Sequence, residues 1–342
     1  MTGLNLRTRY LGLDLLHPVM ASASPLTSSV DGICRLADAG AAAVVMASVY
    51  EEQIAAAELA ELALLEADGG TIPEASDGFF PEAVTDRSVL DERLETLRRA
   101  TDRAGIPVIA SLNGVSPAGW TGFASQLEQA GAAAIELHVV RIPTDFLEDG
   151  AQVDRGCVDV LRAVKARVRI PVSVKLTPFH SSTCHFALQL TQAGADGLTL
   201  FNRFYEPDID LTTLQPRPDF DLSTPADIRL GLTWMSLLHG RLGDASLAAT
   251  SGVWSSEDVV KYLLAGADVV MSASALLRHG PEHIGTLVRG LRTWMDWRGI
   301  DAVDGLRGRL SATHSHGDPG ALLRAYYRNI LAPAPERAGS TR

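Results

Sequence analysis

The amino-acid sequence predicts an α/β fold, a (β/α)8 barrel with an N-terminal hairpin and long loops over its C-terminal face. Two observations predict it. Eight short apolar runs alternate with helical patterns along the chain, and one phrase, a helix end followed by glycine and a buried strand, occurs four times. The chain has 342 residues, of which 46% are hydrophobic, so it is long enough for one such barrel.

The predicted strands are apolar along most of their length, as is typical of strands that are buried on both faces of a parallel sheet. They cover residues 17–24, 41–49, 107–113, 134–140, 171–176, 197–202, 246–252 and 267–274. The segments between them have helical periodicity. Leu90, Leu94 and Leu97 fall on one face of a helix, and Ser255 and Asp258 have the spacing of a capping box at the start of another.

The repeated phrase reads "ADAGAAAVVM" (37–46), "QAGAAAIELH" (129–138), "QAGADGLTLF" (192–201) and "LAGADVVMSA" (264–273). Glycine accepts the left-handed conformation that ends a helix, and alanine allows close packing of helix on strand. A doubly wound sheet would need fewer strands and a G-x-G-x-x-G turn after the first strand, where the chain reads "ASASPLTSS". The barrel is therefore favoured.

Three segments add residues beyond those that a minimal barrel requires. Residues 2–16 alternate polar and apolar side chains, which predicts a hairpin that closes the bottom of the barrel. Residues 50–102 and 204–244 form long connections, which we expect over the C-terminal face. We expect one domain over residues 1–330 and a disordered tail over 331–342, which is rich in Pro, Ala and Gly.

Composition narrows the function. The net charge of −11 argues against nucleic acid and anionic membranes as partners. The chain has 3 cysteines, widely spaced, and its first residues lack the pattern of a secretory signal, so we expect a cytoplasmic protein. Its histidines show no metal-ligand spacing, and we expect no metal.

Barrel enzymes place their chemistry at the C-terminal ends of the strands. Lys175 lies near such an end, where a barely solvated amine requires an anionic partner or loses its proton. Three interpretations stand: stabilisation of charge on a reduced cofactor, a Schiff base, or an ion pair with a carboxylate such as Glu136. The small residues at 251–252 and 273–274 favour a phosphate site.

Other polar side chains at strand ends allow more than one role. Asn202 is suited to a ligand amide or carbonyl, or to capping a loop. His138 is interpreted as a base, a hydrogen-bond donor or a core residue. Arg141 and Arg203 are candidates for holding an anionic substrate, or for surface ion pairs.

Four segments together resemble the dihydroorotate dehydrogenase family. They are "YLGLDLLHPVMASASPLT" (10–27), "VSVKLTP" (172–178), "LTLFNR" (198–203) and "ATSGVWSSEDVVKYLLAGADVVMSASALL" (249–277). The soluble dimeric class is the most similar in plan, and the resemblance covers the chain up to its C-terminal helix. It implies an FMN-dependent barrel oxidoreductase that acts on a CH–CH group, in pyrimidine biosynthesis, as a homodimer with a separate electron acceptor.

The resemblance also implies roles for residues. The backbone of Ala21, Ser22 and Ala23 would lie along the flavin, and Lys175 would stabilise its anionic reduced form. The other positions it implies are Asn113 at the flavin, Asn202 at the flavin or the substrate, and Ser251, Gly252, Ala273 and Ser274 at the phosphate. From their places at strand ends, and not from the resemblance, we expect Ser48, Arg141 and Arg203 at the substrate.

The chain departs from the family at two strand ends. Family members end the second strand on a Thr-Lys pair, where this chain has Ala47 and Ser48. They end the fourth strand on Asn, followed by a loop whose Cys or Ser is the catalytic base. Here His138 takes the place of that Asn, and the replacement bases are His138, Thr144 or Asp145.

These departures predict that the FMN half of the site is retained while the substrate need not be dihydroorotate. Two alternatives accompany this interpretation. One is a non-catalytic flavin-binding partner in a redox complex, and the other is a class I aldolase or lyase that uses Lys175.

Overall fold

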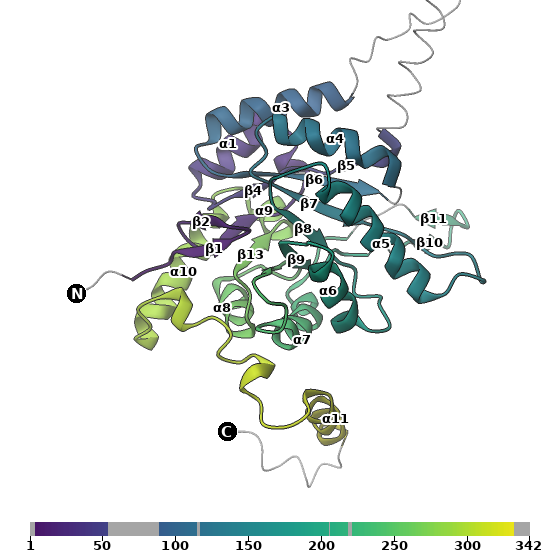
Figure 1. The fold of residues 1–342 in the computed structure, drawn as a ribbon. Coiled ribbons are helices and arrows are strands. Elements are labelled where there is room, and N and C mark those ends of the chain that lie inside the picture. The colour runs from purple at the N-terminus through teal and green to yellow at the C-terminus, as the bar shows by residue number, and fades with distance from the viewer. Residues whose placement is uncertain (1–3, 54–88, 115–116, 205, 218–220, 332–342) are drawn as a thin grey trace, which may run out of the picture.

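A computed structural model describes residues 4–53, 89–114, 117–204, 206–217 and 221–331. Eight parallel strands close into a barrel, which confirms the predicted fold (Figure 1). They are β3 (Val19–Ala21), β4 (Val44–Val45), β6 (Val108–Gly114), β7 (Ala134–Val139), β8 (Val172–Lys175), β9 (Gly197–Leu200), β12 (Ser246–Ala249) and β13 (Val269–Ser272). Pairing of β13 with β3 and of β4 with β6 completes the ring, and β5 (Val49–Tyr50) extends the edge of β6.

Helices surround the barrel and bury their apolar faces against the strands. They are α1 (Val30–Asp38), α3 (Val89–Ala104), α4 (Pro117–Gln129), α5 (Gly150–Lys165), α6 (Thr183–Gln192), α7 (Ile228–Leu238), α8 (Ser256–Ala265), α9 (Ser274–His279) and α10 (His283–Arg298). The core accordingly has two parts. One fills the layer between helices and strands, and a smaller one, which includes Met20, Val45, Ile109 and Met271, fills the barrel interior.

The four glycines of the repeated phrase behave as the sequence predicts. The φ angles of Gly40, Gly131, Gly194 and Gly266 are +93°, +95°, +104° and +120°. These values are in the region that L side chains rarely adopt, so each glycine ends a helix and turns the chain into the next strand.

The predicted hairpin closes the N-terminal end of the barrel. Its strands β1 (Thr8–Tyr10) and β2 (Leu13–Leu15) pair antiparallel. Thr8 Oγ1 donates a hydrogen bond to the carbonyl of Asp268 at 2.9 Å, and the backbone N–H of Leu11 donates to Ser246 Oγ at 3.0 Å. Both acceptors lie where strands begin, so the hairpin is fixed to that end of the barrel.

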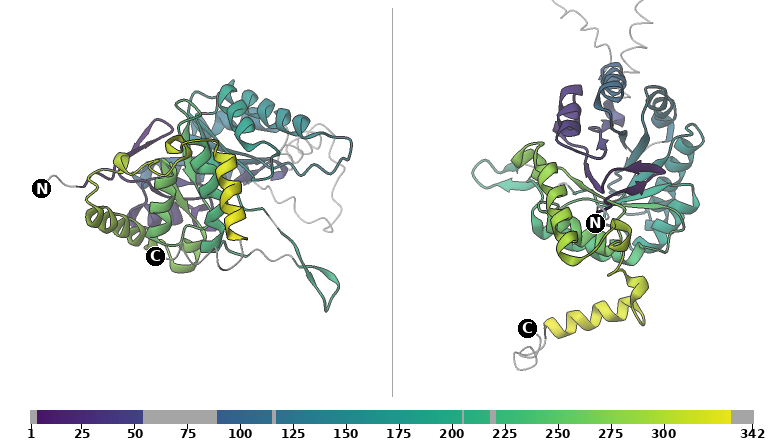
Figure 2. Two further views of the ribbon diagram at one scale, coloured as in Figure 1. Left: turned by 90° about the horizontal axis from the view of Figure 1, so that it is seen from below. Right: turned by 90° about the vertical axis from the view of Figure 1, so that its left-hand side faces the viewer.

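The long connections are described in part. Most of the second one, residues 54–88, lies outside the described residues, as do residues 332–342 of the predicted tail. The sixth contains a hairpin of β10 (Asp208–Asp210) and β11 (Gln215–Arg217), and this hairpin projects from the barrel (Figure 2). A last helix, α11 (Pro319–Ile330), also stands away from it (Figures 1 and 2).

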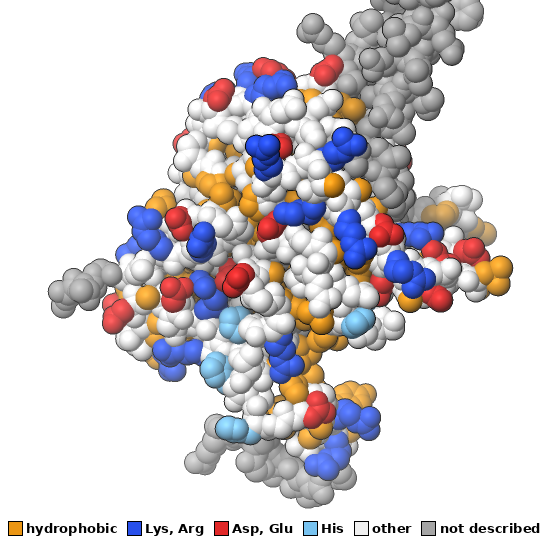
Figure 3. Space-filling view, viewed as in Figure 1, with side chains coloured by type: hydrophobic (Ala, Val, Ile, Leu, Met, Phe, Trp, Pro, Cys, Tyr) orange, Lys and Arg blue, Asp and Glu red, His pale blue; other side chains and the backbone are white. Residues whose placement is uncertain are grey.

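The surface carries both signs of charge. Basic and acidic side chains are interspersed on the face that Figure 3 shows. Among the helices of the described ranges, none is long and apolar enough to cross a membrane. Cys34, Cys157 and Cys184 are all free thiols.

Substitutions at two glycines of the repeated phrase distinguish the energetic cost of backbone strain from that of steric overlap. At Gly40 an added Cβ meets no atom within 4 Å, whereas at Gly266 it would lie 2.3 Å from His239 Cγ. We expect Gly40→Ala to lower the free energy of unfolding by about 1–2 kcal/mol, the cost of a left-handed alanine. Gly266→Ala should lower the free energy of unfolding by about 1–3 kcal/mol more, because the added methyl group overlaps His239. Chemical denaturation of both variants checks this, and equal losses would contradict it.

Candidate functional site

A cavity of about 160 Å³ opens at the C-terminal end of the barrel, among the ends of β3, β8, β9, β12 and β13. Its lining consists of Ser22, Ala23, Ser24, Pro25, Lys175, Phe201, Asn202, Arg203, Leu222, Ser223, Thr250, Ser251, Gly252, Val253, Met271, Ser272, Ala273, Ser274 and Leu277. The cavity thus brings together most residues that the sequence singles out.

The turn after β12 has an unusual backbone. Ser251 and Gly252 have φ angles of +72° and +70° in succession. Ser251 Oγ donates a hydrogen bond to the carbonyl of Phe201 at 3.0 Å, which holds the turn against the end of β9. A Cβ at Gly252 would lie 2.4 Å from the backbone nitrogen of Ile228. Only glycine fits there, because the turn approaches the start of α7 so closely.

Ser223 joins the site from the long connection at 204–244, in which the sequence does not mark this residue. Its hydroxyl donates to Ser274 Oγ at 2.8 Å, and its backbone N–H donates to the same oxygen at 3.0 Å. Trp254 Nε1 donates a hydrogen bond to the backbone carbonyl of Ser223 at 2.7 Å. The capping sequence at Thr224–Asp227 marks a helix start nearby, but nothing in the sequence pattern places that loop against the end of β13.

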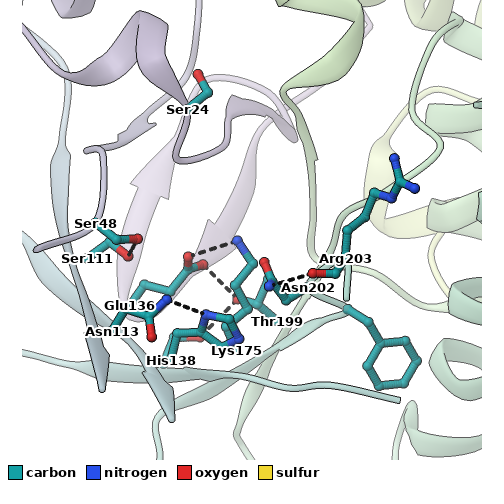
Figure 4. A network of polar contacts seen from close by, with 12 residues as sticks. Ser24, Ser48, Ser111, Asn113, Glu136, His138, Lys175, Thr199, Asn202 and Arg203 are labelled. Atoms are coloured by element: carbon teal, nitrogen blue, oxygen red, sulfur yellow. Dashed lines mark hydrogen bonds and ion pairs between the residues drawn. The ribbon is translucent and has the colours of Figure 1, made fainter. Parts of the chain in front are cut away.

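Lys175 forms a buried ion pair. Its Nζ lies 3.3 Å from Glu136 Oε1, and the two side chains are 8% and 1% exposed. Thr199 Oγ1 donates to Glu136 Oε2 at 3.1 Å, so both carboxylate oxygens are engaged (Figure 4). The ion pair with Glu136, one of the three interpretations of Lys175, is therefore present, and it coexists with the position of Lys175 on the cavity wall.

The polar contacts continue down the barrel interior. Ser173 Oγ lies 3.3 Å from Thr199 Oγ1, and the hydroxyl of Tyr10, from the N-terminal hairpin, donates to Ser173 Oγ at 3.2 Å. Burial, and secondly the charge of Glu136, raises the pKa of Tyr10 far above its usual value. A connected row of side chains therefore runs from the closed end of the barrel to Lys175 at the open end.

His138 lies at the end of β7 and is 4% exposed. Its Nδ1 is 3.3 Å from Asn113 Nδ2 on β6 (Figure 4). In this amide orientation an amide nitrogen can only donate, so Nδ1 accepts and the proton of the neutral ring sits on Nε2. No group among the described residues is a partner for Nε2. Burial, and secondly the charge of Lys175, lowers the pKa of His138 to about 3.

These facts define what His138 can do. A ring that is neutral near pH 7 and carries its proton on Nε2 is a hydrogen-bond donor. It is a poor base, because Nδ1 is engaged with Asn113 and its pKa is far below the operating range. Of the three interpretations of His138, the geometry favours the donor.

Several predicted residues lie away from the cavity. Arg141 pairs with Glu148 of its own loop at 2.5 Å. Ser48 Oγ lies 2.8 Å from Ser111 Oγ on β6, and Ala21 is fully buried within β3. Thr144 and Asp145 are exposed in the loop after β7. The structure therefore does not bring these residues to the wall that Lys175 lines, and His138 and Asn113 are also absent from the lining.

Asn202 and Arg203 do line the cavity. Asn202 Nδ2 donates to the carbonyl of Arg203 at 2.8 Å, and Arg203 Nη1 donates to the carbonyl of Asp221. Within the described part of the chain, no three His, Cys, Asp or Glu side chains are grouped to hold a metal ion. The site is therefore an open pocket with one buried cation, several hydroxyls and a constrained turn.

Comparison with known proteins bears on this site. A family model described as dihydroorotate dehydrogenase matches residues 81–295, more than half of the chain. Two similar relatives are dihydroorotate dehydrogenase B (NAD(+)) catalytic subunits. That of Methanothermobacter thermautotrophicus is 28% identical over 89% of this chain and 97% of its own length, and that of Methanocella arvoryzae is 29% identical over 87% and 96%.

A third relative belongs to the other type. The dihydroorotate dehydrogenase A (fumarate) of Lacticaseibacillus paracasei is 32% identical over 55% of this chain and 65% of its own length. The extent of the family match decides the assignment, and it agrees with the barrel and with the cavity at its C-terminal end. The chain belongs to the dihydroorotate dehydrogenase family, whose members are FMN-dependent oxidoreductases that act on CH–CH donors.

Proposed function

We propose that this protein binds FMN in the cavity at the C-terminal end of the barrel and oxidises a CH–CH group of a small anionic substrate. The observation that carries the proposal is that one cavity holds both Lys175 and the Ser251–Gly252 turn. A buried cation and a constrained, hydroxyl-lined turn suit the two charged ends of the cofactor, its ring after reduction and its phosphate.

The residues present fit the phosphate. Phosphate oxygens accept hydrogen bonds, and Ser223, Ser251 and Ser274 line the cavity. Ser274 Oγ accepts from Ser223, so its own hydroxyl proton can donate to a phosphate. The close approach at Gly252 leaves backbone, not side chain, on this part of the wall. Ser251, Gly252, Ala273 and Ser274 would hold the phosphate, with Ser223 as a fifth member.

The residues near β3, β8 and β9 would hold the ring. When bound, FMN supplies the acceptor for a hydride from the substrate. Lys175 would stabilise the negative charge that reduction leaves on the ring, while Ser22, Ala23 and Asn202 would line it. Asn113 would not contact the cofactor itself. Its amide would act indirectly, by holding the ring of His138.

The substrate side differs from the family pattern. Residues 139–149 contain no Cys or Ser that could replace the usual base, and Asp145 Oδ1 already accepts from the backbone N–H of Leu147 at 2.9 Å. His138 would donate its Nε2 proton to a substrate or cofactor oxygen, and Arg203 would favour an anion. We therefore propose that dihydroorotate is a poor substrate. The absence of Cys and Ser from residues 139–149 also favours a second candidate, a non-catalytic flavin protein within a redox complex.

The sequence also raises expectations about the electron acceptor, the oligomeric state and the location of the protein. The relatives' names give NAD(+) for two and fumarate for one. We propose that a separate electron acceptor reoxidises the flavin. A homodimer and a cytoplasmic location stay predictions. The aldolase alternative is set aside, because it rests on Lys175 alone, whereas members of the family are flavin enzymes.

FMN binding is the first test. We expect the purified protein to show flavin absorbance and Gly252→Ala to weaken FMN binding about tenfold or more, a change of 1.4 kcal/mol. Gly243→Ala is the matched control, since its φ is also positive, at +62°, and an added Cβ meets nothing within 4 Å. Titration of the apoprotein with FMN measures both. A protein that takes up no FMN would overturn the proposal.

Reduction of the bound FMN by dihydroorotate is the second test. A positioned general base contributes about 10²–10⁴-fold to rate, so the reaction should be slower by that factor than in the Methanothermobacter relative. Anaerobic stopped-flow absorbance of the two proteins under the same conditions measures it. Comparable rates would show that this chain does supply a base.

The state of His138 predicts a pH dependence of stability. Its folded pKa of about 3 lies below the ordinary 6.5, so between these values the unfolded chain binds more protons and stability falls as pH falls. From pH 7 to pH 5 the free energy of unfolding should drop by about 2 kcal/mol more in the wild type than in His138→Gln. Urea denaturation at both pH values measures this. Equal drops would mean that His138 is not held neutral.

A further inference from the structure

The Glu136–Lys175 pair calls for a reason beyond stability. Both side chains are almost fully buried, at 1% and 8% exposed. Removing two charges from water costs as much as their attraction returns, and apolar residues of similar size often stabilise a protein equally well. Lys175 reaches the cavity, whereas Glu136 does not line it. Glu136 therefore makes no direct contact with a ligand in the cavity and influences it through charge.

We propose that Glu136 is a positioning residue that lowers the reduction potential of the bound cofactor by sharing the charge of Lys175. The inference rests on the proposed function, because it requires a cofactor beside Lys175. When bound, FMN would accept a hydride from a substrate C–H bond and would carry one negative charge more after reduction. The substrate is oxidised and the adjacent proton leaves to solvent or to a base.

The electrostatic argument has a definite sign. Lys175 attracts the charge that reduction adds, which favours the reduced flavin. Glu136 Oε1, 3.3 Å from Nζ, repels the same charge and offsets part of this attraction. In a buried site water screens neither effect well. Glu136 therefore keeps the flavin easier to reoxidise than Lys175 alone would.

The surroundings hold the carboxylate in this role. Oε2 accepts from Thr199 Oγ1 at 3.1 Å, and Thr199 is linked to Ser173 and then to Tyr10 of the hairpin. Lys175 and Thr199 thus engage different oxygens of the carboxylate, and Figure 4 shows both contacts of Glu136. Rotation of Glu136 away from Lys175 would leave buried polar atoms without partners.

The test is the midpoint potential of FMN in the full-length holoprotein, measured by equilibration with a reference dye. Glu136→Gln keeps the shape and the acceptor oxygen but removes the charge. We expect it to shift the equilibrium between oxidised and reduced flavin about tenfold or more toward reduced, ~30 mV upward for two electrons. Sulfite, an anion that adds to oxidised flavin, should bind about tenfold more tightly to this variant. Ser173→Ala is the control, because it removes one hydroxyl from the series of polar contacts that joins Tyr10 to Glu136 and leaves the charge unchanged. The flavin potential of this variant should match that of the wild type.

The outcomes are distinguishable. A wild type that binds no FMN defeats the proposed function itself. A holoprotein whose potential and sulfite affinity are the same in Glu136→Gln as in the wild type defeats the inference alone, and leaves the ion pair structural. If Glu136→Gln does not fold, Glu136→Asp serves as the second variant. Its side chain is shorter by one methylene, so the negative charge lies farther from Lys175. This variant should raise the potential by a smaller amount, and no change there would also overturn the inference.

Discussion

Polar side chains inside a closed barrel must find partners within the barrel, because water does not reach them. This constraint organises the interior of the protein. Tyr10, Ser173, Thr199, Glu136 and Lys175 form one row in which each group contacts the next. The N-terminal hairpin contributes the first member, so closing the bottom of the barrel and orienting the lysine at the top are parts of the same arrangement.

The two halves of the site depend on different parts of the chain. The proposed phosphate end is built from backbone, through consecutive positive φ angles at Ser251 and Gly252 and a glycine with no room for a Cβ. The substrate end is built from side chains, with His138 held by Asn113 beside Lys175. Backbone geometry tolerates little change, whereas side chains exchange freely. A family member can therefore keep its cofactor site while its substrate site diverges, as we propose for this chain.

Local chemistry explains what could be predicted from the sequence. Each repeated glycine has its own reason to follow a helix, so Gly40, Gly131, Gly194 and Gly266 reveal the repeating unit and, with it, the barrel. Once the strands are known, their ends are known, and Lys175 and the Ser251–Gly252 turn follow.

Contacts between distant segments account for what could not be predicted. Ser223 reaches Ser274 across 51 positions in a loop without periodicity. Arg141 turns to Glu148 instead of the cavity, a choice between two partners that spacing does not decide. The tautomer of His138 depends on an amide from the neighbouring strand. The ion pair with Glu136 was one of three interpretations, and register alone did not select it.

We propose that Lys175, fixed by Glu136, faces a flavin held by the turn after β12. A crystal structure of the protein saturated with FMN would test this arrangement. We expect the phosphate against Ser251, Gly252 and Ser274, and Lys175 Nζ within hydrogen-bond distance of both the flavin ring and Glu136. A flavin bound elsewhere, or a ring placed out of reach of Lys175, would contradict it.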